Sequence, residues 1–136
     1  MDITRYVRFQ DGSGSAYGIL DGTTIHEFAG DLFGHHKETG RKFHIEEVKL
    51  QCPCEPPKIL AVGRNYKSHL GTRPQPANPE MFYKPTSSLL PAEGTIVIPP
   101  DAQNVHYEGE LVLVIGKRAK NVPVDEAHEY VFGVTC

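Results

Sequence analysis

The sequence of 136 residues has no tryptophan, only three cysteines and no long apolar run. No segment approaches the roughly 20 apolar residues of a membrane-spanning helix, so we expect no contact with a membrane. Residues 1–5 lack the charged-then-apolar pattern of a secretory signal, which favours a cytoplasmic protein. Three cysteines cannot form a closed disulfide set, and Cys52 and Cys54 do not have the spacing of a redox or zinc motif. We expect free thiols in a linker.

The chain also lacks a concentration of charge of one sign. Its net charge is −3, and the basic residues are scattered rather than clustered. A protein that binds nucleic acid or an anionic membrane usually carries a basic patch. We therefore expect neither partner, and the composition favours chemistry on a small molecule. The length is sufficient for a domain with a real core.

The turn and proline patterns divide the chain into three parts. Residues 1–50 are expected to form a small β-rich N-terminal domain, with hairpins at the Gly-Ser turn of residues 11–15 and at Asp21-Gly22. Residues 30–41 are polar and glycine-punctuated, which favours a loop, and residues 43–50 favour a short strand or helical turn. Residues 51–57 contain three prolines and are expected to be a stiff linker.

Residues 58–136 are expected to be the first part of a second, catalytic domain. A short buried strand at 58–63 is followed by a loop or short helix and by a proline-rich segment at 71–79, the best candidate for a mobile cover over a cavity. The later pattern favours strands at 81–84 and 108–115, a helix at 124–130, and a strand at 131–136 that has no evident partner. The chain therefore resembles an incomplete domain.

Two glutamates two positions apart, Glu108 and Glu110, precede an unbroken apolar run. Successive strand residues point to opposite faces, so in a strand both carboxylates would share one face, roughly 7 Å apart. Such a pair favours a hard divalent cation, Mg²⁺, Mn²⁺ or Ca²⁺. His106 would lie on the same face, which leaves Zn²⁺ open. The alternative is a strand end that carries solvated acids.

Four segments in order then resemble the fumarylacetoacetate hydrolase family: Gly-Arg-Asn-Tyr-Lys-Ser-His at 63–69, Phe-Tyr-Lys-Pro at 82–85, Tyr-Glu-Gly-Glu-Leu at 107–111, and Tyr-Val-Phe-Gly-Val-Thr-Cys at 130–136. The resemblance implies a mainly β fold with short helices, a mixed β-sandwich roll of which this chain holds about the first half. It also implies a Mg²⁺ or Mn²⁺ ion, a keto-acid substrate and a homodimer.

The resemblance also implies site residues. Glu108 and Glu110 match two metal ligands, His69 matches a water-activating base, and Lys84 falls in a segment that lines the substrate cavity. Arg64 and Tyr66, in the first motif, are further substrate-binding candidates, with loop packing as the alternative. Histidine exchanges protons near neutral pH, which suits a base.

Three functions stay open at this point. The first is a metal-dependent hydrolase that cleaves a carbon-carbon bond in a β-diketo acid such as an acylpyruvate, through a metal-stabilised enolate. The second is an isomerase or decarboxylase of unsaturated 2-keto or 2-hydroxy-dienoate diacids. The third is a truncated relative without activity.

Two departures from the family pattern bear on this choice. Thr72 stands where many members have a glutamate that would orient the histidine, so another acid such as Glu80 would have to substitute. A third metal ligand, an aspartate, is expected beyond Cys136. We therefore expect residues 1–136 alone to be inactive.

Overall fold

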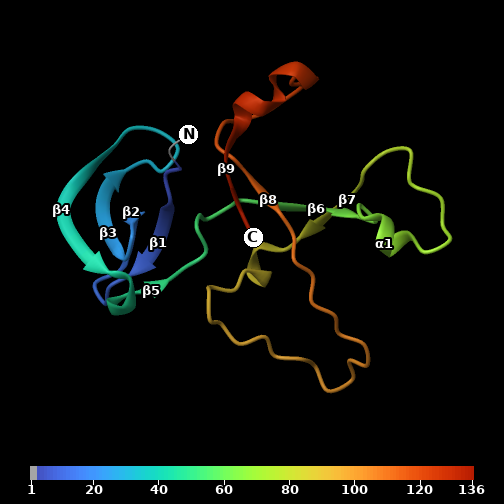
Figure 1. Cartoon of the computed structure of the whole chain (residues 1–136), viewed down its shortest axis with the longest axis horizontal. Helices are drawn as coiled ribbons and strands as arrows, with labels where there is room; N and C mark the ends of the chain where they lie inside the picture. The colour runs from blue at the N-terminus through green and yellow to red at the C-terminus, as the bar shows by residue number, and fades with distance from the viewer. Residues whose placement is uncertain (1–2) are drawn as a thin grey trace.

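The computed structural model describes residues 3–136. Met1 and Asp2, which begin the stretch that lacks the pattern of a secretory signal, lie outside the described residues. Figure 1 shows a curved sheet built from the first part of the chain and, beside it, two hairpins and long irregular segments built from the rest. Within residues 3–136, none of the helices has the length and apolar character needed to cross a membrane. The mainly β fold expected from the sequence is confirmed.

Five antiparallel strands form the N-terminal sheet, in the order β4-β3-β2-β1-β5. The elements are β1 (Tyr6–Gln10), β2 (Ser15–Asp21), β3 (Thr24–Gly30), β4 (His36–His44), the 3-10 helix η1 (Ile45–Glu47) and β5 (Lys49–Leu50). Both predicted hairpins are confirmed. In the first turn the backbone N–H and hydroxyl of Ser13 donate to Asp11 Oδ1, at 2.9 and 2.6 Å. In the second, Gly22 has a φ of 57°, which glycine adopts without steric cost.

The predicted loop over residues 30–41 is wrong in its second half, because β4 begins at His36 and pairs with β3. Most β4 side chains are exposed, so their polarity reflects a solvated edge strand and not a lack of backbone pairing. Residues 43–50 contain both alternatives left open by the sequence, a strand end with a helical turn and the short β5.

Most of the buried apolar side chains among the described residues belong to this N-terminal part of the chain. Phe9 and Ile25 are fully buried, and the Phe9 ring lies 5.1 Å from that of Phe43. The acid Glu27 is also buried, with an exposed fraction of 3%. It accepts hydrogen bonds from Arg41 Nε at 2.7 Å and from the Thr39 hydroxyl at 2.5 Å. A buried carboxylate is tolerated when it is paired in this way.

The second part of the chain has fewer and shorter elements. They are β6 (Ile59–Gly63), α1 (Lys67–Leu70), β7 (Glu80–Lys84), η2 (Thr86–Ser88), β8 (Val112–Ile115), η3 (Val124–Tyr130) and β9 (Val131–Thr135). The predicted strands near 58–63 and 81–84 are confirmed and form an antiparallel hairpin. The predicted helix at 124–130 is confirmed as a 3-10 helix.

Two predictions for this part are wrong. The last strand does have a partner, because β9 pairs with β8 in an antiparallel register that joins Val112 to Thr135. The strand expected over 108–115 begins only at Val112, and the residues before it, with Glu108 and Glu110, are exposed and form no strand pair within residues 3–136. Because β9 is short, it pairs only with Val112 to Ile115, the end of the apolar run.

Most of the second part is solvated. Ala61 and Leu70 are its buried apolar side chains among the described residues, and β6 is therefore less buried than expected. Its main aromatic contact with the sheet is Phe132 of β9, whose ring lies 5.2 Å from Tyr6 and 5.0 Å from Phe33. This contact holds the β8–β9 hairpin against the N-terminal sheet.

Candidate functional site

His69 and Glu108, two candidates from different motifs, lie close together. His69 belongs to the short helix α1, and Glu108 belongs to the irregular segment before β8. His69 Nδ1 is 3.8 Å from Glu108 Oε1, and both side chains are about half exposed. The Tyr66 ring, at the start of α1, lies edge-on to the His69 ring at a centroid distance of 6.2 Å. The structure thus places two predicted site residues, Glu108 and Tyr66, beside the imidazole of a third, His69.

The donors for a metal ion are only partly assembled. Glu108 and Glu110 supply oxygen atoms, which suit Mg²⁺ or Mn²⁺. Across residues 3–136, however, no group of three or more histidine, cysteine, aspartate or glutamate side chains has an arrangement that could hold a metal ion. His106, the basis of the zinc alternative, joins no such group either. The described residues therefore do not fit a complete metal site.

Arg64 is bound to Glu80 rather than facing open space. Its Nε donates to Glu80 Oε2 at 2.6 Å, and its terminal nitrogen pairs with the other carboxylate oxygen. Hydrogen bonds from Arg64 lower the pKa of the Glu80 carboxyl, and the same bonds raise the pKa of Arg64. Glu80, the acid expected to substitute as a partner for His69, is therefore paired with Arg64, and Glu108 is the acid that faces the imidazole.

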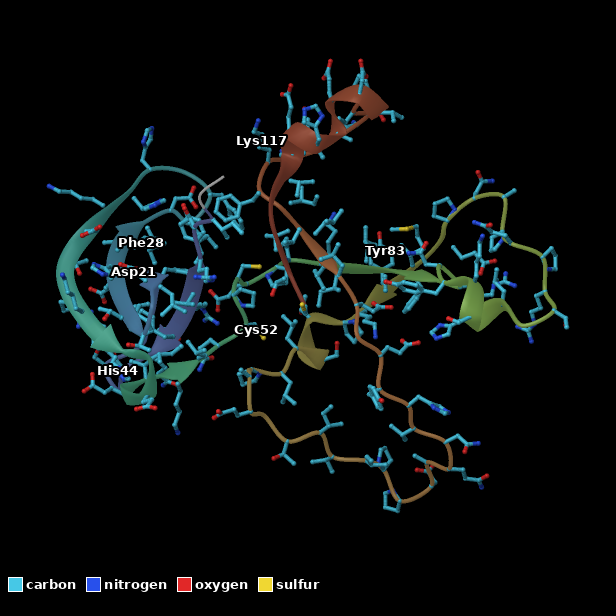
Figure 2. The ribbon with its side chains drawn as sticks, viewed as in Figure 1. Asp21, Phe28, His44, Cys52, Tyr83 and Lys117 are labelled. Carbon is cyan, nitrogen blue, oxygen red and sulfur yellow. The ribbon has the colours of Figure 1, made fainter. Side chains whose placement is uncertain are left out.

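Lys84 is the last residue of β7, and Glu80 is the first residue of the same strand. Strand residues advance about 3.3 Å each, so the two backbone positions are roughly 13 Å apart. The Lys84 ammonium lies 5.9 Å from the centre of the Phe82 ring, and the side chain borders a hollow with Lys58, Tyr83 and Thr86. Tyr83 projects from the β6–β7 hairpin in Figure 2. The structure does not bring Lys84 into contact with His69.

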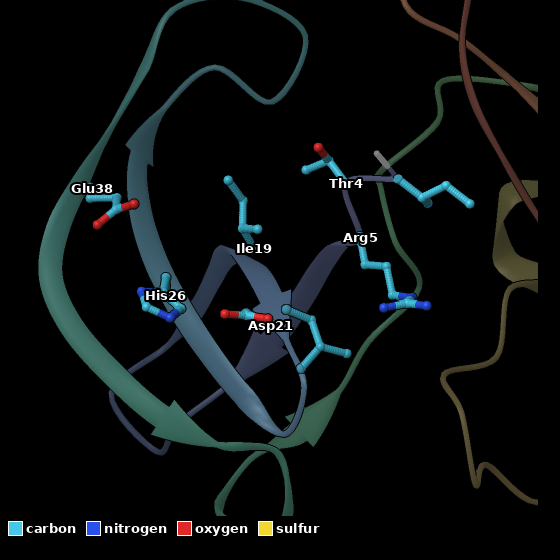
Figure 3. Close-up of a pocket in the computed structure, with 8 residues that line it drawn as sticks. Thr4, Arg5, Ile19, Asp21, His26 and Glu38 are labelled. Atoms are coloured by element: carbon cyan, nitrogen blue, oxygen red, sulfur yellow. The ribbon is translucent and has the colours of Figure 1, made fainter. Parts of the chain in front are cut away.

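A second hollow lies on the N-terminal sheet. Figure 3 shows Arg5, Asp21, His26 and Glu38 among the residues around it, contributed by the chain before β1 and by β2, β3 and β4. None of the site residues predicted from the sequence borders this hollow. It is a charged surface depression of the N-terminal sheet, separate from the His69 region.

Sequence reasoning missed two polar partnerships. The Arg64–Glu80 pair follows from the hairpin register, in which Gly63 lies opposite Glu80, but that register depends on a partner strand 17 positions away. The pairing of Glu27 with Arg41 depends on β4, and the polar composition of β4 led to the wrong prediction of a loop. The cysteines agree with expectation, since Cys52, Cys54 and Cys136 are all free thiols.

Comparison with known proteins gives two family matches. Residues 58–136 match the model described as fumarylacetoacetate (FAA) hydrolase C-terminal, and residues 4–53 match the model described as Rv2993c-like, N-terminal. The first match covers more than half of the chain and contains every site residue predicted from the sequence. The second covers the five-stranded sheet.

Individual relatives agree with these matches. The chain is 36% identical to protein Rv2993c of Mycobacterium tuberculosis, over 96% of this chain and 53% of the relative. It is 48% identical to an Arabidopsis thaliana protein named oxaloacetate tautomerase FAHD1, mitochondrial, over 56% of this chain and 35% of the relative. Among solved structures, the 2-hydroxyhepta-2,4-diene-1,7-dioate isomerase from Mycobacterium marinum superposes with a TM-score of 0.82 at 31% identity, over 97% of this chain and 52% of that chain. The chain thus spans about half the length, or less, of these relatives.

Proposed function

Because the chain belongs to the fumarylacetoacetate hydrolase family, we propose that it contributes His69 and Glu108 to an enzyme that interconverts the keto and enol forms of a 2-oxo acid. The observation that carries this proposal is the approach of His69 Nδ1 to Glu108 Oε1, at 3.8 Å. The similar proteins named tautomerase and isomerase support the same reaction class. Both activities require a proton to leave or join a carbon next to a carbonyl group.

His69 is proposed as the group that carries this proton. Its Nδ1 faces Glu108, which leaves Nε2 to take a proton from the carbon beside the substrate's carbonyl. The carbon-hydrogen bond breaks, a nitrogen-hydrogen bond forms, and the electron pair moves to the carbonyl oxygen as an enolate. The nearby Glu108 carboxylate stabilises the imidazolium that results. Return of the proton to another atom completes an isomerisation or tautomerisation.

Tyr66 and Lys84 are proposed to bind the substrate. The Tyr66 ring lies against His69, so its hydroxyl can reach a small molecule beside the imidazole. Lys84, at the C-terminal end of β7, supplies a cation for a substrate carboxylate. Arg64 contributes only if a substrate carboxylate replaces Glu80 as its partner.

A divalent cation at Glu108 and Glu110 and a homodimer are further parts of the proposal. The carboxylates have the donor type that Mg²⁺ and Mn²⁺ prefer, but two carboxylates hold Mg²⁺ weakly unless more donors are preorganised. Equilibrium dialysis with Mn²⁺ tests the ion, and light scattering tests the dimer. Cleavage of an acylpyruvate, the first of the three functions that the sequence leaves open, would need an attacking water in addition to the same base.

The proposal is tested by proton exchange at carbon. The product of the complete reading frame that encodes this chain is incubated with oxaloacetate or pyruvate in heavy water containing Mg²⁺, and NMR follows loss of the hydrogen next to the carbonyl. Exchange reports enolisation whether the later outcome is isomerisation or decarboxylation. We expect His69→Gln to lower the exchange rate by a factor of about 10² or more.

The matched control is His128→Gln, which removes an exposed histidine of η3 and should leave the exchange rate unchanged. Equal rates for His69→Gln and the unaltered protein would refute the assigned base. A parallel assay with an acylpyruvate separates the two reaction classes, because only hydrolysis releases a second carboxylic acid.

A further inference from the structure

The segment of residues 64–79 connects β6 to β7 and carries α1. The register of the hairpin ends where Gly63 lies opposite Glu80, so this segment is the loop that closes the hairpin. Its two ends are joined a second time by side chains. Arg64, its first residue, makes two parallel hydrogen bonds to the carboxylate of Glu80, the residue that follows the segment, and these two residues are 16 positions apart.

Arg64 also has an unusual backbone conformation at the start of the segment. Its φ is 53°, in the left-handed region that residues other than glycine seldom adopt. Such a conformation persists where the surrounding contacts determine it. A bidentate arginine-carboxylate pair fixes direction as well as distance, because the guanidinium fork matches the two carboxylate oxygens.

The rest of the segment has few other attachments among the described residues. Leu70 is buried, and its neighbours between Tyr66 and Pro79 are mostly exposed. Two local backbone bonds shape the helical turn, His69 N–H to Tyr66 O at 3.0 Å and Arg73 N–H to Leu70 O at 2.9 Å. Neither bond connects the turn to another part of the chain. The position of α1 therefore depends on Leu70 and on how the ends of the segment are tied.

We propose that Arg64 and Glu80 form a latch that closes the 64–79 segment and holds His69 of α1 against Glu108. Glu80 is then a positioning residue, which acts on the imidazole through Arg64 and the backbone of the segment. The catalytic consequence rests on the proposed function of His69. The latch itself does not rest on the proposed function, because it concerns only how firmly the 64–79 segment is held in place. The lowered pKa of Glu80 agrees with an ionised carboxylate in this pair.

Hydrogen-deuterium exchange of the 136-residue chain, read by mass spectrometry, tests the latch. The probes are the amides between Tyr66 and Arg73, and the strands of the N-terminal sheet serve as an internal reference. Glu80→Gln keeps the shape of the side chain but removes its charge. We expect it to speed exchange of these probes by about two- to fivefold, the range for loss of a solvated ion pair. About 1 M NaCl should have the same effect on the unaltered chain and little on the variant.

Two further variants make the result specific. Glu55→Gln removes the partner of Arg8 near the N-terminal sheet, a pair with a 2.6 Å contact, and should leave exchange between Tyr66 and Arg73 unchanged. The charge-swapped chain, Arg64→Glu with Glu80→Arg, should restore slow exchange. The latch is overturned if Glu80→Gln leaves these amides unchanged, if the swapped chain stays as fast as the single variant, or if the reference strands accelerate equally. Failure of the proton-exchange assay with an intact latch would instead overturn the proposed function.

Discussion

Burial differs between the two parts of the chain. The same substitution, isoleucine to alanine, should therefore reduce the free energy of unfolding by very different amounts in each part. Ile25 of β3 is fully buried, whereas Ile115 at the end of β8 is 52% exposed. Replacing either by alanine removes the same three carbon atoms from a β-strand. The intrinsic strand preference lost is similar in both, so the difference in unfolding free energy reports the surroundings of each side chain.

The expected magnitudes follow from burial. Removing three fully buried carbons at Ile25 loses about 2.4 kcal/mol of transfer free energy, at about 0.8 kcal/mol for each carbon. A residual cavity adds to this, because Gly18 and its strand are already packed against Ile25 and cannot easily close the space. We expect a loss of about 3 to 4 kcal/mol for Ile25→Ala. For Ile115→Ala roughly half of the transfer term applies, with no enclosed cavity, so the loss is about 1 kcal/mol.

Urea unfolding of the 136-residue chain, followed by far-ultraviolet circular dichroism because the chain has no tryptophan, measures both losses. Ile25→Ala should shift the midpoint strongly, and Ile115→Ala should shift it by about a third as much or less. Equal losses would refute the reasoning, since they would show that β8 is covered in solution. A concentration-dependent midpoint for the unaltered chain would identify a second copy as the cover.

Three other predictions concern charged groups. Glu108→Ala and Glu110→Ala should each weaken Mn²⁺ binding at least about tenfold, measured by electron paramagnetic resonance, and retained affinity in both would refute the proposed ligands. His69→Gln should lower proton exchange without changing Mn²⁺ affinity, and loss of the ion would make His69 a ligand instead. Hydrogen bonds from Arg41 lower the pKa of the Glu27 carboxyl below its ordinary value. This pair therefore stabilises the fold at pH values above the unfolded-state pKa, and its contribution is lost as pH falls through the folded-state pKa. Arg41→Met should therefore reduce thermal stability at neutral pH and shrink the loss on acidification, whereas parallel melting curves against pH would contradict the assignment.

Local chemistry explains which parts of the fold could be predicted from the sequence. The hairpins at residues 11–15 and at Asp21-Gly22 depend on turn residues that lie within a few positions of each other, and both were predicted correctly. The 3-10 helix at Val124–Tyr130 follows Pro123 and has acids in its first turn, which are also local signals. In each case the information that determines the structure is contained in the segment itself.

Non-local pairing explains the errors. Strand β4 reads as a polar loop because its side chains face water, and its strand conformation comes from the backbone of β3 and from the bonds of Thr39 and Arg41 to Glu27. The partner of β9 was missed for the same reason, since β8 lies many residues earlier in the chain. Composition reports the solvent exposure of a strand, but the neighbouring strand decides whether it forms.

The same principle governs the candidate site. The family motifs identified His69 and Glu108, but no periodicity in the sequence predicts that their side chains lie 3.8 Å apart. The expected shared face of Glu108 and Glu110 assumed a strand that starts at Glu108, whereas β8 starts at Val112. A neighbouring strand beside residues 107–111 would extend β8, set both carboxylates on one face roughly 7 Å apart, and fix Glu108 relative to His69. The geometry of this site therefore depends on backbone pairing at residues 107–111 as much as on the identity of its side chains.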